Sequence, residues 1–569
     1  MKTIRNIFLV IIFGALVAFC LYIAPNYKKS GNEGKTNLVI NYTNVTSTMK
    51  GEVIIDDGNV YLSKEDIENY YDRYIYYDKQ YNYIIVAANN KVACFDISKQ
   101  IVDINGETHK AKVLAMNNTY YIPINELQDV YNIKVQYKDS TDTVVIESLN
   151  RKLEVAKTNK DVKVKYKSII FSKTLEKISS GSKVAIVPNQ PNNKGWTLVR
   201  TENGVLGYVK NSNLGDTTIE RNEETIIQNK KISLVWEYFS EVASAPKVEQ
   251  GQKYDGVNVV SPSFFYMDSS TVKENVGEDG KNYIKWAKSN NYQVWAMVSN
   301  NNNSTEKIDE FSNWINDYEK RKLVIDQIVK YVQEYELDGI NIDFENIYLK
   351  DKDALSRFII ELKPVLKNEG AVLSVDVTEP DGSDTWSLCF NRNVIGNVAD
   401  YIVFMAYDQF SQYSNVAGPT AACYWVERNI NKFINQEEVE PSKIILGIPF
   451  YTVLWQDNEG AVSGTSIPQK NIKIPDNVEV MWLEDSKQNY MAYTQNNSIF
   501  RLIWICIMIY RNTRYTQNNK SYKMWIEDAE ATSYKLDFVE KYGLAGAAFW
   551  EKGYEDESVW QIVKQKILE

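Results

Sequence analysis

The sequence predicts an α/β chain whose C-terminal part is a (β/α)8 TIM barrel, preceded by a small α+β repeat domain and a small β-barrel. Three observations carry this prediction. Eight short apolar runs alternate with helical patterns over residues 231–569, a pattern recurs at an offset of 60 residues within 36–150, and short strands with turn signals fill 153–216. Near-continuous apolar strands separated by helices are typical of a parallel sheet covered by helices, and eight of them match a closed barrel.

The first 25 residues predict a signal-anchor. Lys2 and Arg5 precede an uncharged apolar run over residues 7–24, which is just long enough to span a bilayer as a helix. Large residues at position −3 of the two candidate cleavage sites, Leu16 and Tyr22, disfavour cleavage. Because the positive charges are held inside, we expect the rest of the chain on the extracytoplasmic face, anchored through residues 7–24 or secreted to the cell wall.

Residues 36–150 contain two copies of one pattern, each predicting a strand, a helical turn and two strands joined by a polar turn. The pattern resembles the N-terminal domain of copper amine oxidases. The resemblance implies a stalk or wall-contacting module without copper chemistry, because the necessary histidines are absent. Matched positions are Tyr61 with Tyr121, Ile67 with Leu127, Tyr71 with Tyr131, Ile75 with Val135, Tyr77 with Tyr137, Ile84 with Val144 and Val86 with Ile146.

Residues 153–216 consist of short strands separated by turns. The segment from Trp196 to Tyr208 and Val209 resembles bacterial SH3-like domains, which often stand beside cell-wall hydrolases. The alternative is a generic small barrel with Trp196 in its core. We expect a charged linker over residues 219–230.

The amino-acid composition limits the partners and catalytic groups that the chain can use. The 569 residues carry 64 Lys and Arg against 74 Asp and Glu, so the formal net charge is −10, which disfavours nucleic-acid partners. The single histidine, His109, excludes zinc sites built from several histidines, and the five cysteines form no CxxC pair. We expect carboxylates, tyrosines and amides to do the chemistry, with no metal and no cofactor.

The barrel strands are expected at residues 232–239, 256–265, 292–299, 338–345, 371–378, 401–408, 444–450 and 544–550. Reacting groups in such barrels lie at the carboxyl ends of the strands. The polar or aromatic side chains at those ends are Ser299, Glu345, Asp376, Tyr407, Asp408 and Trp550.

The fourth strand carries the strongest chemical signal. Its alternation places Asn341, Asp343 and Glu345 on one face, toward the barrel interior. Buried polar side chains are costly unless they bind each other or a ligand. Two stacked carboxyl groups favour one of them keeping its proton, as a general acid requires near neutral pH.

These residues lie in motifs of a known family. DGINIDFE at 338–345 resembles the DxxDxDxE signature of glycoside hydrolase family 18, the chitinase-like family, while FMAYD at 404–408 and AFW at 548–550 resemble its strand-six and strand-eight motifs. GPTAACYWVERNI at 418–430 and MWIEDA at 524–529 resemble segments of bacterial spore-cortex and cell-wall N-acetylglucosaminidases. The resemblance covers residues 231–569.

The resemblance implies a retaining mechanism in which the substrate's own acetamido group is the nucleophile. Its catalytic residues would be Glu345 as acid and base, Asp343 as the partner of the acetamido N–H, and Tyr407 as the partner of the acetamido oxygen. The substrate-binding residues would be Asn341, Asp408 and Trp550, the last by stacking on the sugar.

Two features depart from the family pattern. Asn341 replaces the middle carboxylate of the signature; it can hydrogen-bond Asp343 but cannot share a proton with it. The pentapeptide YTQNN at 493–497 recurs at 515–519, with an apolar run between the copies. We favour a duplicated insertion at 498–519 between strands seven and eight; an extra buried strand and a hydrophobic partner surface are the alternatives.

The favoured function is an exported glycosidase that cleaves N-acetylglucosamine-containing polysaccharide. The anchor, the SH3-like module and the wall-enzyme resemblance favour peptidoglycan, with chitin-type oligomers and N-glycan cores left open. A catalytically silent carbohydrate-binding protein on the same barrel is the alternative, although such relatives commonly lose the acid and Glu345 is present. A surface scaffold would leave the polar fourth strand unexplained.

Overall fold

The computed structural model describes residues 34–190, 195–222, 230–239, 253–458, 460–495 and 520–569. The chain divides into two compact units, an N-terminal unit, Met1–Gln228, and a C-terminal unit, Asn229–Glu569. Within the described residues, no helix is long and apolar enough to cross a membrane. The predicted signal-anchor at 7–24 lies outside them.

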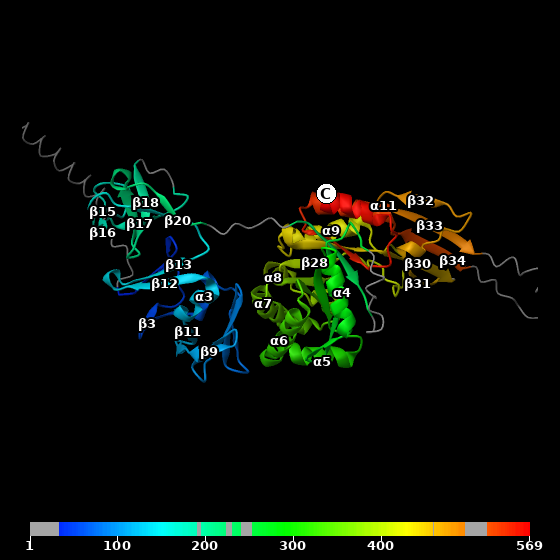
Figure 1. The fold of residues 1–569 in the computed structure, drawn as a ribbon, viewed down its shortest axis with the longest axis horizontal. Helices are drawn as coiled ribbons and strands as arrows, with labels where there is room; N and C mark the ends of the chain where they lie inside the picture. The colour runs from blue at the N-terminus through cyan, green and yellow to red at the C-terminus, as the bar shows by residue number, and fades with distance from the viewer. Residues whose placement is uncertain (1–33, 191–194, 223–229, 240–252, 459, 496–519) are drawn as a thin grey trace, which may run out of the picture. The chain divides into compact units, whose positions relative to one another are not determined.

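The C-terminal unit is built on a closed barrel of eight parallel strands (Figure 1). Each strand pairs in parallel with its two neighbours, and β22 closes the circle against β25. All eight fall within the predicted ranges, which confirms the predicted fold class. The strands are β21 (Ile232–Glu237), β22 (Val259–Pro262), β25 (Gln293–Ser299), β26 (Gly339–Asp343), β27 (Val372–Val377), β28 (Tyr401–Met405), β29 (Ile444–Pro449) and β35 (Gly546–Trp550).

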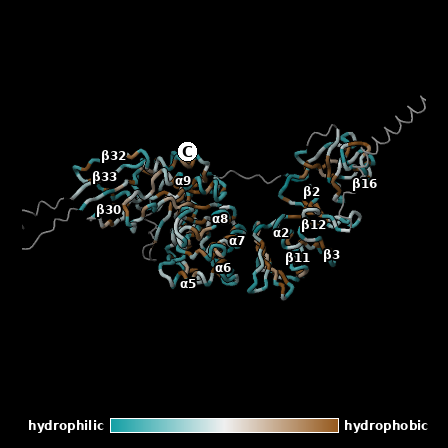
Figure 2. Tube along the Cα trace, turned by 180° about the vertical axis from the view of Figure 1, so that it is seen from behind, coloured by the Kyte–Doolittle hydropathy of each residue, from teal (hydrophilic) through white to brown (hydrophobic). Residues whose placement is uncertain are grey.

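Strand alternation creates two separate cores in this unit. Trp236, Trp295 and Met297 fill the barrel interior, whereas Ile340, Ile342 and other outward side chains pack beneath the helices. In Figure 2, brown hydrophobic stretches lie among the labelled helices α5 to α9 of the C-terminal unit. The helices are α4 (Gly277–Ser289), α5 (Thr305–Ile315), α6 (Tyr318–Tyr335), α7 (Lys352–Asn368), α8 (Arg392–Val398), α9 (Cys423–Asn435), α11 (Ala529–Lys541) and α12 (Val559–Val563).

A five-stranded antiparallel sheet is inserted between barrel strands β29 and β35. It packs against the barrel partly through an ion pair between Lys535 of α11 and Glu527, 2.7 Å apart and both fully buried. Gln488 donates a further hydrogen bond of 2.6 Å to the same carboxylate. The strands are β30 (Tyr451–Asn458), β31 (Ala461–Pro468), β32 (Val480–Leu483), β33 (Gln488–Gln495) and β34 (Lys520–Ile526).

The N-terminal unit contains the predicted repeat. The first copy forms β4 (Asn59–Ser63), α2 (Lys64–Tyr70), β5 (Tyr76–Asp78) and β6 (Tyr83–Ala88); the second forms β11 (Thr119–Pro123), η2 (Ile124–Leu127), α3 (Gln128–Tyr131), β12 (Ile133–Lys138) and β13 (Thr143–Ser148). Strands β4 and β11 pair antiparallel about Leu62 and Ile122, which are equivalent positions in the two copies. The copies therefore meet through their first strands, a pairing that the period alone did not reveal.

The second part of this unit is a seven-stranded antiparallel sheet. Its core consists of five valines, at 162, 164, 184, 199 and 209. Trp196 is half-buried, with the Lys210 ammonium 5.7 Å from its ring centroid, so the expected position of Trp196 in the core is wrong. The SH3-like domain and the generic small barrel both stay predictions. The strands are β14 (Leu153–Lys157), β15 (Val162–Lys165), β16 (Thr174–Ile178), β17 (Lys183–Ile186), β18 (Trp196–Thr201), β19 (Leu206–Lys210) and β20 (Thr218–Arg221).

The start of the charged linker predicted at 219–230 is wrong, because its first residues belong to the sheet. Residues 218–221 form β20, which pairs with β14, and Arg221 donates a 3.0 Å bond to Glu147 of β13. Arg200 of β18 contacts the same carboxylate. A charged sequence is therefore structured here because its charges are paired.

The predicted insertion at 498–519 lies outside the described residues, but its flanks are described. Strands β33 and β34 pair continuously up to Gln495 and Lys520. Deleting residues 498–519 would join these ends through Asn496 and Asn497, and asparagine is favoured in two-residue hairpin turns. We expect the deletion variant to fold with an unfolding midpoint within a few degrees of the parent, as measured by circular dichroism.

A variant with Val453→Asp in β30, where the side chain is 1% exposed, serves as the control for a damaged sheet. Loss of the cooperative transition on deletion would show that 498–519 is needed for folding.

Candidate active site

Strand β26 arranges the polar side chains of the site. Ile340, Ile342 and Phe344 are 0–1% exposed and belong to the core beneath the helices. The alternate side chains Asn341, Asp343 and Glu345 therefore face the interior and the carboxyl end of the barrel. Asn341 lies deepest, whereas Asp343 and Glu345 are half-buried.

Asn341 is the hub of a buried hydrogen-bond network. Its amide nitrogen donates to Ser374 Oγ at 3.1 Å and to Asp376 Oδ1 at 2.8 Å, both on β27. Its amide oxygen accepts from Trp236 Nε1 at 3.0 Å and from Ser261 Oγ at 3.2 Å, on β21 and β22. With no exposed surface and all four hydrogen-bonding positions occupied, Asn341 has no free position for a sugar or for Asp343. The structure therefore corrects its assignment as a substrate-binding residue.

The carboxyl groups at this end of the barrel have raised pKa values. Burial raises the pKa of Asp343 to about 6. Burial, reinforced by the negative charges of Asp343 and Asp408, raises the pKa of Glu345 well above its ordinary value. Burial and Asp343 raise the pKa of Asp376 in the same way, although the hydrogen bond from Asn341 opposes them. A raised pKa is the property that a general acid needs to carry a proton at higher pH than an ordinary carboxyl group.

Asp343 also has an open hydrogen-bonding position. Its Oδ1 is buried and has no partner among the described residues. A buried acceptor without a partner is costly and indicates a position that a donor can fill.

Strand β28 delivers Tyr407 and Asp408 to the same end. Burial and the nearby carboxyl groups raise the pKa of Tyr407, so its hydroxyl stays a hydrogen-bond donor. Asp408 has a backbone φ of 59° and accepts a 2.5 Å hydrogen bond from the Tyr451 hydroxyl. Burial raises the pKa of Asp408, and this hydrogen bond opposes the shift. Tyr451 begins β30, so the inserted sheet holds part of the site.

Aromatic rings form one wall. The Trp550 ring centroid lies 5.9 Å from that of Trp236 and 6.3 Å from that of Tyr238. Trp236 in turn meets Tyr407 edge-on, with centroids 6.5 Å apart. Trp550 is half-buried and Tyr238 is 57% exposed, so both can offer ring surface to a ligand.

Five predicted residues, Asp343, Glu345, Tyr407, Asp408 and Trp550, thus lie at one end of the barrel, with Asn341 beneath them. Sequence reasoning missed Trp236, Tyr451 and Asn300, which respectively bind Asn341, Asp408 and the backbone of Glu345. Asn300 directly follows β25, and Tyr451 lies two residues after the end of β29, so the strand-end rule could have found both. Trp236 could not have been found in this way, because in the sequence it is only an apolar residue within a predicted strand.

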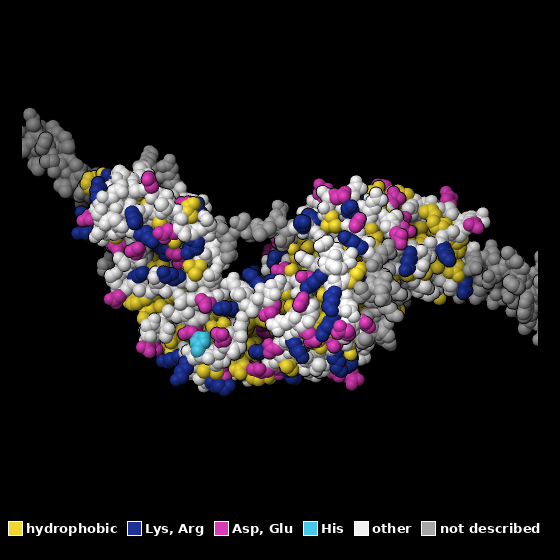
Figure 3. Space-filling view, viewed as in Figure 1, with side chains coloured by type: hydrophobic (Ala, Val, Ile, Leu, Met, Phe, Trp, Pro, Cys, Tyr) yellow, Lys and Arg dark blue, Asp and Glu magenta, His cyan; other side chains and the backbone are white. Residues whose placement is uncertain are grey.

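No metal site emerges from the described part of the chain, where no group of three or more His, Cys, Asp or Glu side chains is arranged to hold an ion. Basic and acidic side chains are interspersed on the visible face of the C-terminal unit (Figure 3).

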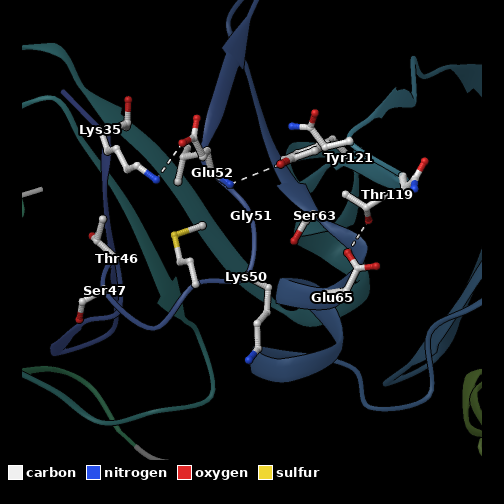
Figure 4. Close-up of a pocket in the computed structure, with 15 residues that line it drawn as sticks. Lys35, Thr46, Ser47, Lys50, Gly51, Glu52, Ser63, Glu65, Thr119 and Tyr121 are labelled. Atoms are coloured by element: carbon white, nitrogen blue, oxygen red, sulfur yellow. Dashed lines mark hydrogen bonds and ion pairs between the residues drawn. The ribbon is translucent and has the colours of Figure 1, made fainter.

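The N-terminal unit has a polar hollow of about 730 Å³ beside α2 (Figure 4). Lys35 and Glu52 form an ion pair of 2.8 Å on its wall, and the Glu52 N–H donates to the Tyr121 hydroxyl at 3.4 Å. The carboxylate side chains in its lining, Glu52 and Glu65, are both exposed.

Carboxyl groups with raised pKa values beside aromatic rings suit the cleavage of a sugar–sugar bond, and a parallel barrel presents them at the strand ends where such enzymes work. The chain is a glycosidase. The sequence profile of glycosyl hydrolases family 18 matches residues 234–555, more than half of the chain, and the chain belongs to this family. The profile of the copper amine oxidase N-terminal domain matches residues 39–146.

Curated relatives agree with this family. The glycosylase YvbX of Bacillus subtilis is 23% identical over 51% of this chain and 79% of its own length. The cortical fragment-lytic enzyme of Bacillus subtilis is 20% identical over 44% of this chain and 55% of its own length. Human di-N-acetylchitobiase is 23% identical over 41% of this chain and 65% of its own length. The chain thus spans about four fifths of YvbX and between half and two thirds of the other two.

Solved structures of other proteins are also similar to this chain. A chitinase from Chromobacterium violaceum matches with a TM-score of 0.48 and 20% identity, covering 60% of this chain and 99% of its own. The spore cortex-lytic enzyme SleL of Bacillus cereus matches with a TM-score of 0.48 and 15% identity, covering 62% of this chain and 77% of its own.

The raised pKa of Asp343 predicts that ionisation of this carboxyl group lowers the free energy of unfolding. The folded state binds this proton more tightly than the unfolded state, so the group's stabilising contribution is complete below pH 3.8 and is lost as the pH rises through about 6. Asp343→Asn removes this loss. We expect the variant to be about 1–3 kcal/mol more stable than the parent at pH 7, with the difference vanishing near pH 4, in urea unfolding.

Asp326→Asn on the exposed surface of α6 is the control and should shift stability by about 0.5 kcal/mol or less. Equal stability of the Asp343→Asn variant and the parent at pH 7 would contradict the prediction.

Proposed function

We propose that the protein hydrolyses N-acetylglucosamine-containing polysaccharide by substrate-assisted retaining catalysis. The observation that carries this proposal is the pair formed by Glu345, a carboxyl group whose pKa is raised, and Asp343, whose Oδ1 has no partner within the described residues. An acid and an unoccupied acceptor on one strand face match the two groups that the first step needs.

In the first step, Glu345 gives its proton to the glycosidic oxygen as the bond from that oxygen to the anomeric carbon breaks. The acetamido carbonyl oxygen of the substrate forms a new bond to the anomeric carbon, which gives an oxazolinium ion. Asp343 accepts the acetamido N–H and offsets the positive charge, and the Tyr407 hydroxyl donates to the acetamido oxygen. Asp408 contacts the bound sugar, and the Trp550 ring stacks on it.

In the second step, water enters where the leaving sugar stood. The Glu345 carboxylate takes a proton from the water, and the water oxygen attacks the anomeric carbon. The bond to the acetamido oxygen breaks, so the acetamido group is restored and the configuration is retained. Each displacement occurs on the opposite face from the bond it breaks, and Glu345 ends protonated for the next cycle.

Peptidoglycan is the favoured polymer. Two similar proteins are named a cortical fragment-lytic enzyme and a spore cortex-lytic enzyme. A third is named a di-N-acetylchitobiase, which keeps chitin-type oligomers as the second candidate. Both candidates carry the acetamido group that the mechanism requires.

The proposal includes an extracytoplasmic location. Residues 1–25 serve as the signal-anchor, 36–150 as the stalk, 153–216 as an SH3-like wall-contacting module and 231–569 as the catalytic barrel. The support is the charged and apolar pattern of the N-terminus and the seven-stranded antiparallel sheet that residues 153–221 form.

The decisive test compares the full chain with a Glu345→Gln variant on purified peptidoglycan and, separately, on N-acetylglucosamine oligomers. Loss of a general acid typically costs about 10²–10⁴-fold, so the variant should fall to near background in a mass-spectrometric assay of new reducing ends. Glu319→Gln, which removes an exposed charge on α6, should leave the rate unchanged. Polymer capture without cleavage by the parent chain would favour the carbohydrate-binding alternative.

The acetamido group gives a second prediction. Removing the acetyl groups from an oligomer removes the nucleophile while leaving the sugar ring intact. We expect the de-N-acetylated oligomer to resist cleavage, with product below about 1% of that from the acetylated oligomer by mass spectrometry, since proximity of an internal nucleophile supplies much of the rate. Comparable cleavage of both oligomers would point to a protein nucleophile.

A further inference from the structure

Glu345 lies beyond the reach of the barrel's backbone ladder. Strand β26 ends at Asp343, whose ladder partner is Ser299, the last residue of β25. Glu345 follows two residues later, and Asn346 after it adopts a left-handed backbone with φ of 51°. Strand pairing therefore does not fix the backbone from which the acid extends.

The side chain of Asn300 takes over where the ladder stops. Its amide nitrogen donates to the Glu345 carbonyl at 2.6 Å, and its amide oxygen accepts from the Glu345 N–H at 3.1 Å. A side-chain amide carries the same donor and acceptor as a peptide group. The Asn300 side chain thus makes the pair of hydrogen bonds that a neighbouring strand's backbone would make, and both bonds join it to the backbone of Glu345.

The surroundings hold this side chain in place. Asn300 is only 6% exposed, so both hydrogen bonds are largely shielded from competing water. Two residues on, Asn302 is equally buried and donates to the Asn346 carbonyl at 3.3 Å. The loop after β25 therefore braces the loop after β26 at two successive residues, with the stronger contact at Glu345.

We propose that Asn300 is a positioning residue for the general acid: its amide fixes the Glu345 backbone so that the carboxyl proton points at the glycosidic oxygen. The inference rests on the proposed role of Glu345. Asn300 acts through Glu345 and touches no reacting atom. Aspartate cannot replace it because a carboxylate lacks the N–H donor and would face the Glu345 carbonyl with a second acceptor. Alanine removes both bonds without adding bulk.

The first test is the rate of the full chain carrying Asn300→Ala, measured on the polymer that the parent cleaves. Displacements of about 1 Å at a reacting group cost on the order of 10²-fold, so we expect kcat to fall about 10- to 100-fold. KM should stay within about twofold, because the sugar-binding residues are untouched. Asn302→Ala, which removes the weaker neighbouring brace, is the matched control and should lose less than about threefold in kcat.

A second readout separates positioning of the acid from general damage to the barrel. The probe is an aryl glycoside of N,N′-diacetylchitobiose that carries a 2,4-dinitrophenyl leaving group. This group departs without protonation, so its release does not need the general acid. In a single turnover, which reports only the first step, Asn300→Ala should release dinitrophenolate within about threefold of the parent rate while remaining slow on the polymer. Equal losses on both substrates, or a polymer rate equal to that of the parent, would overturn the inference.

The double variant keeps the inference and the proposed function distinguishable. If Asn300 works through Glu345, adding Asn300→Ala to Glu345→Gln should not slow the residual polymer cleavage further. A further loss of the full single-variant factor would mean that Asn300 acts independently, and the inference fails while the role of Glu345 stands. An active Glu345→Gln variant would instead remove the proposed function and the inference with it.

Discussion

The arrangement of the site depends on the four hydrogen bonds that the side-chain amide of Asn341 makes. This amide joins β26 to β27 beside it and, across the interior, to Trp236 and Ser261 on β21 and β22. These bonds satisfy a polar group that would otherwise be costly to bury. Because all four positions are filled, the amide fixes the depth of β26 in the barrel and, with it, the places of Asp343 and Glu345. A neutral group does this without adding a charge beneath two carboxyl groups.

The same burial that stabilises the barrel tunes its chemistry. Moving a carboxyl group out of water disfavours its charged form, and each neighbouring carboxylate adds to the effect. Both effects raise the pKa of Glu345. The inserted sheet contributes as well, because Tyr451 at the start of β30 supplies a hydrogen bond to Asp408. The buried ion pair of Lys535 and Glu527 joins that sheet to α11 and so holds the five-stranded sheet against the barrel.

Local patterns predicted the elements well but not their partners. The alternation of Ile340, Asn341 and Ile342 predicted which side chains face inward, because a strand's period is a local property. It could not show that Asn341 is saturated by four groups from other strands, so its assignment as a sugar contact was wrong. Likewise, the 60-residue period predicted two copies, whereas the direct pairing of Leu62 with Ile122 arises only when the chain folds back on itself.

The sequence by itself determined the eight barrel strands, the repeat and the set of acidic and aromatic residues at the strand ends. These follow from periodicity and composition, which act over a few residues at a time. Only the tertiary structure decided which polar groups meet: Trp236 with Asn341, Tyr451 with Asp408 and Asn300 with the Glu345 backbone. Such contacts join residues 43 to 105 positions apart, and they form because barrel closure brings the ends of distant strands within hydrogen-bond distance.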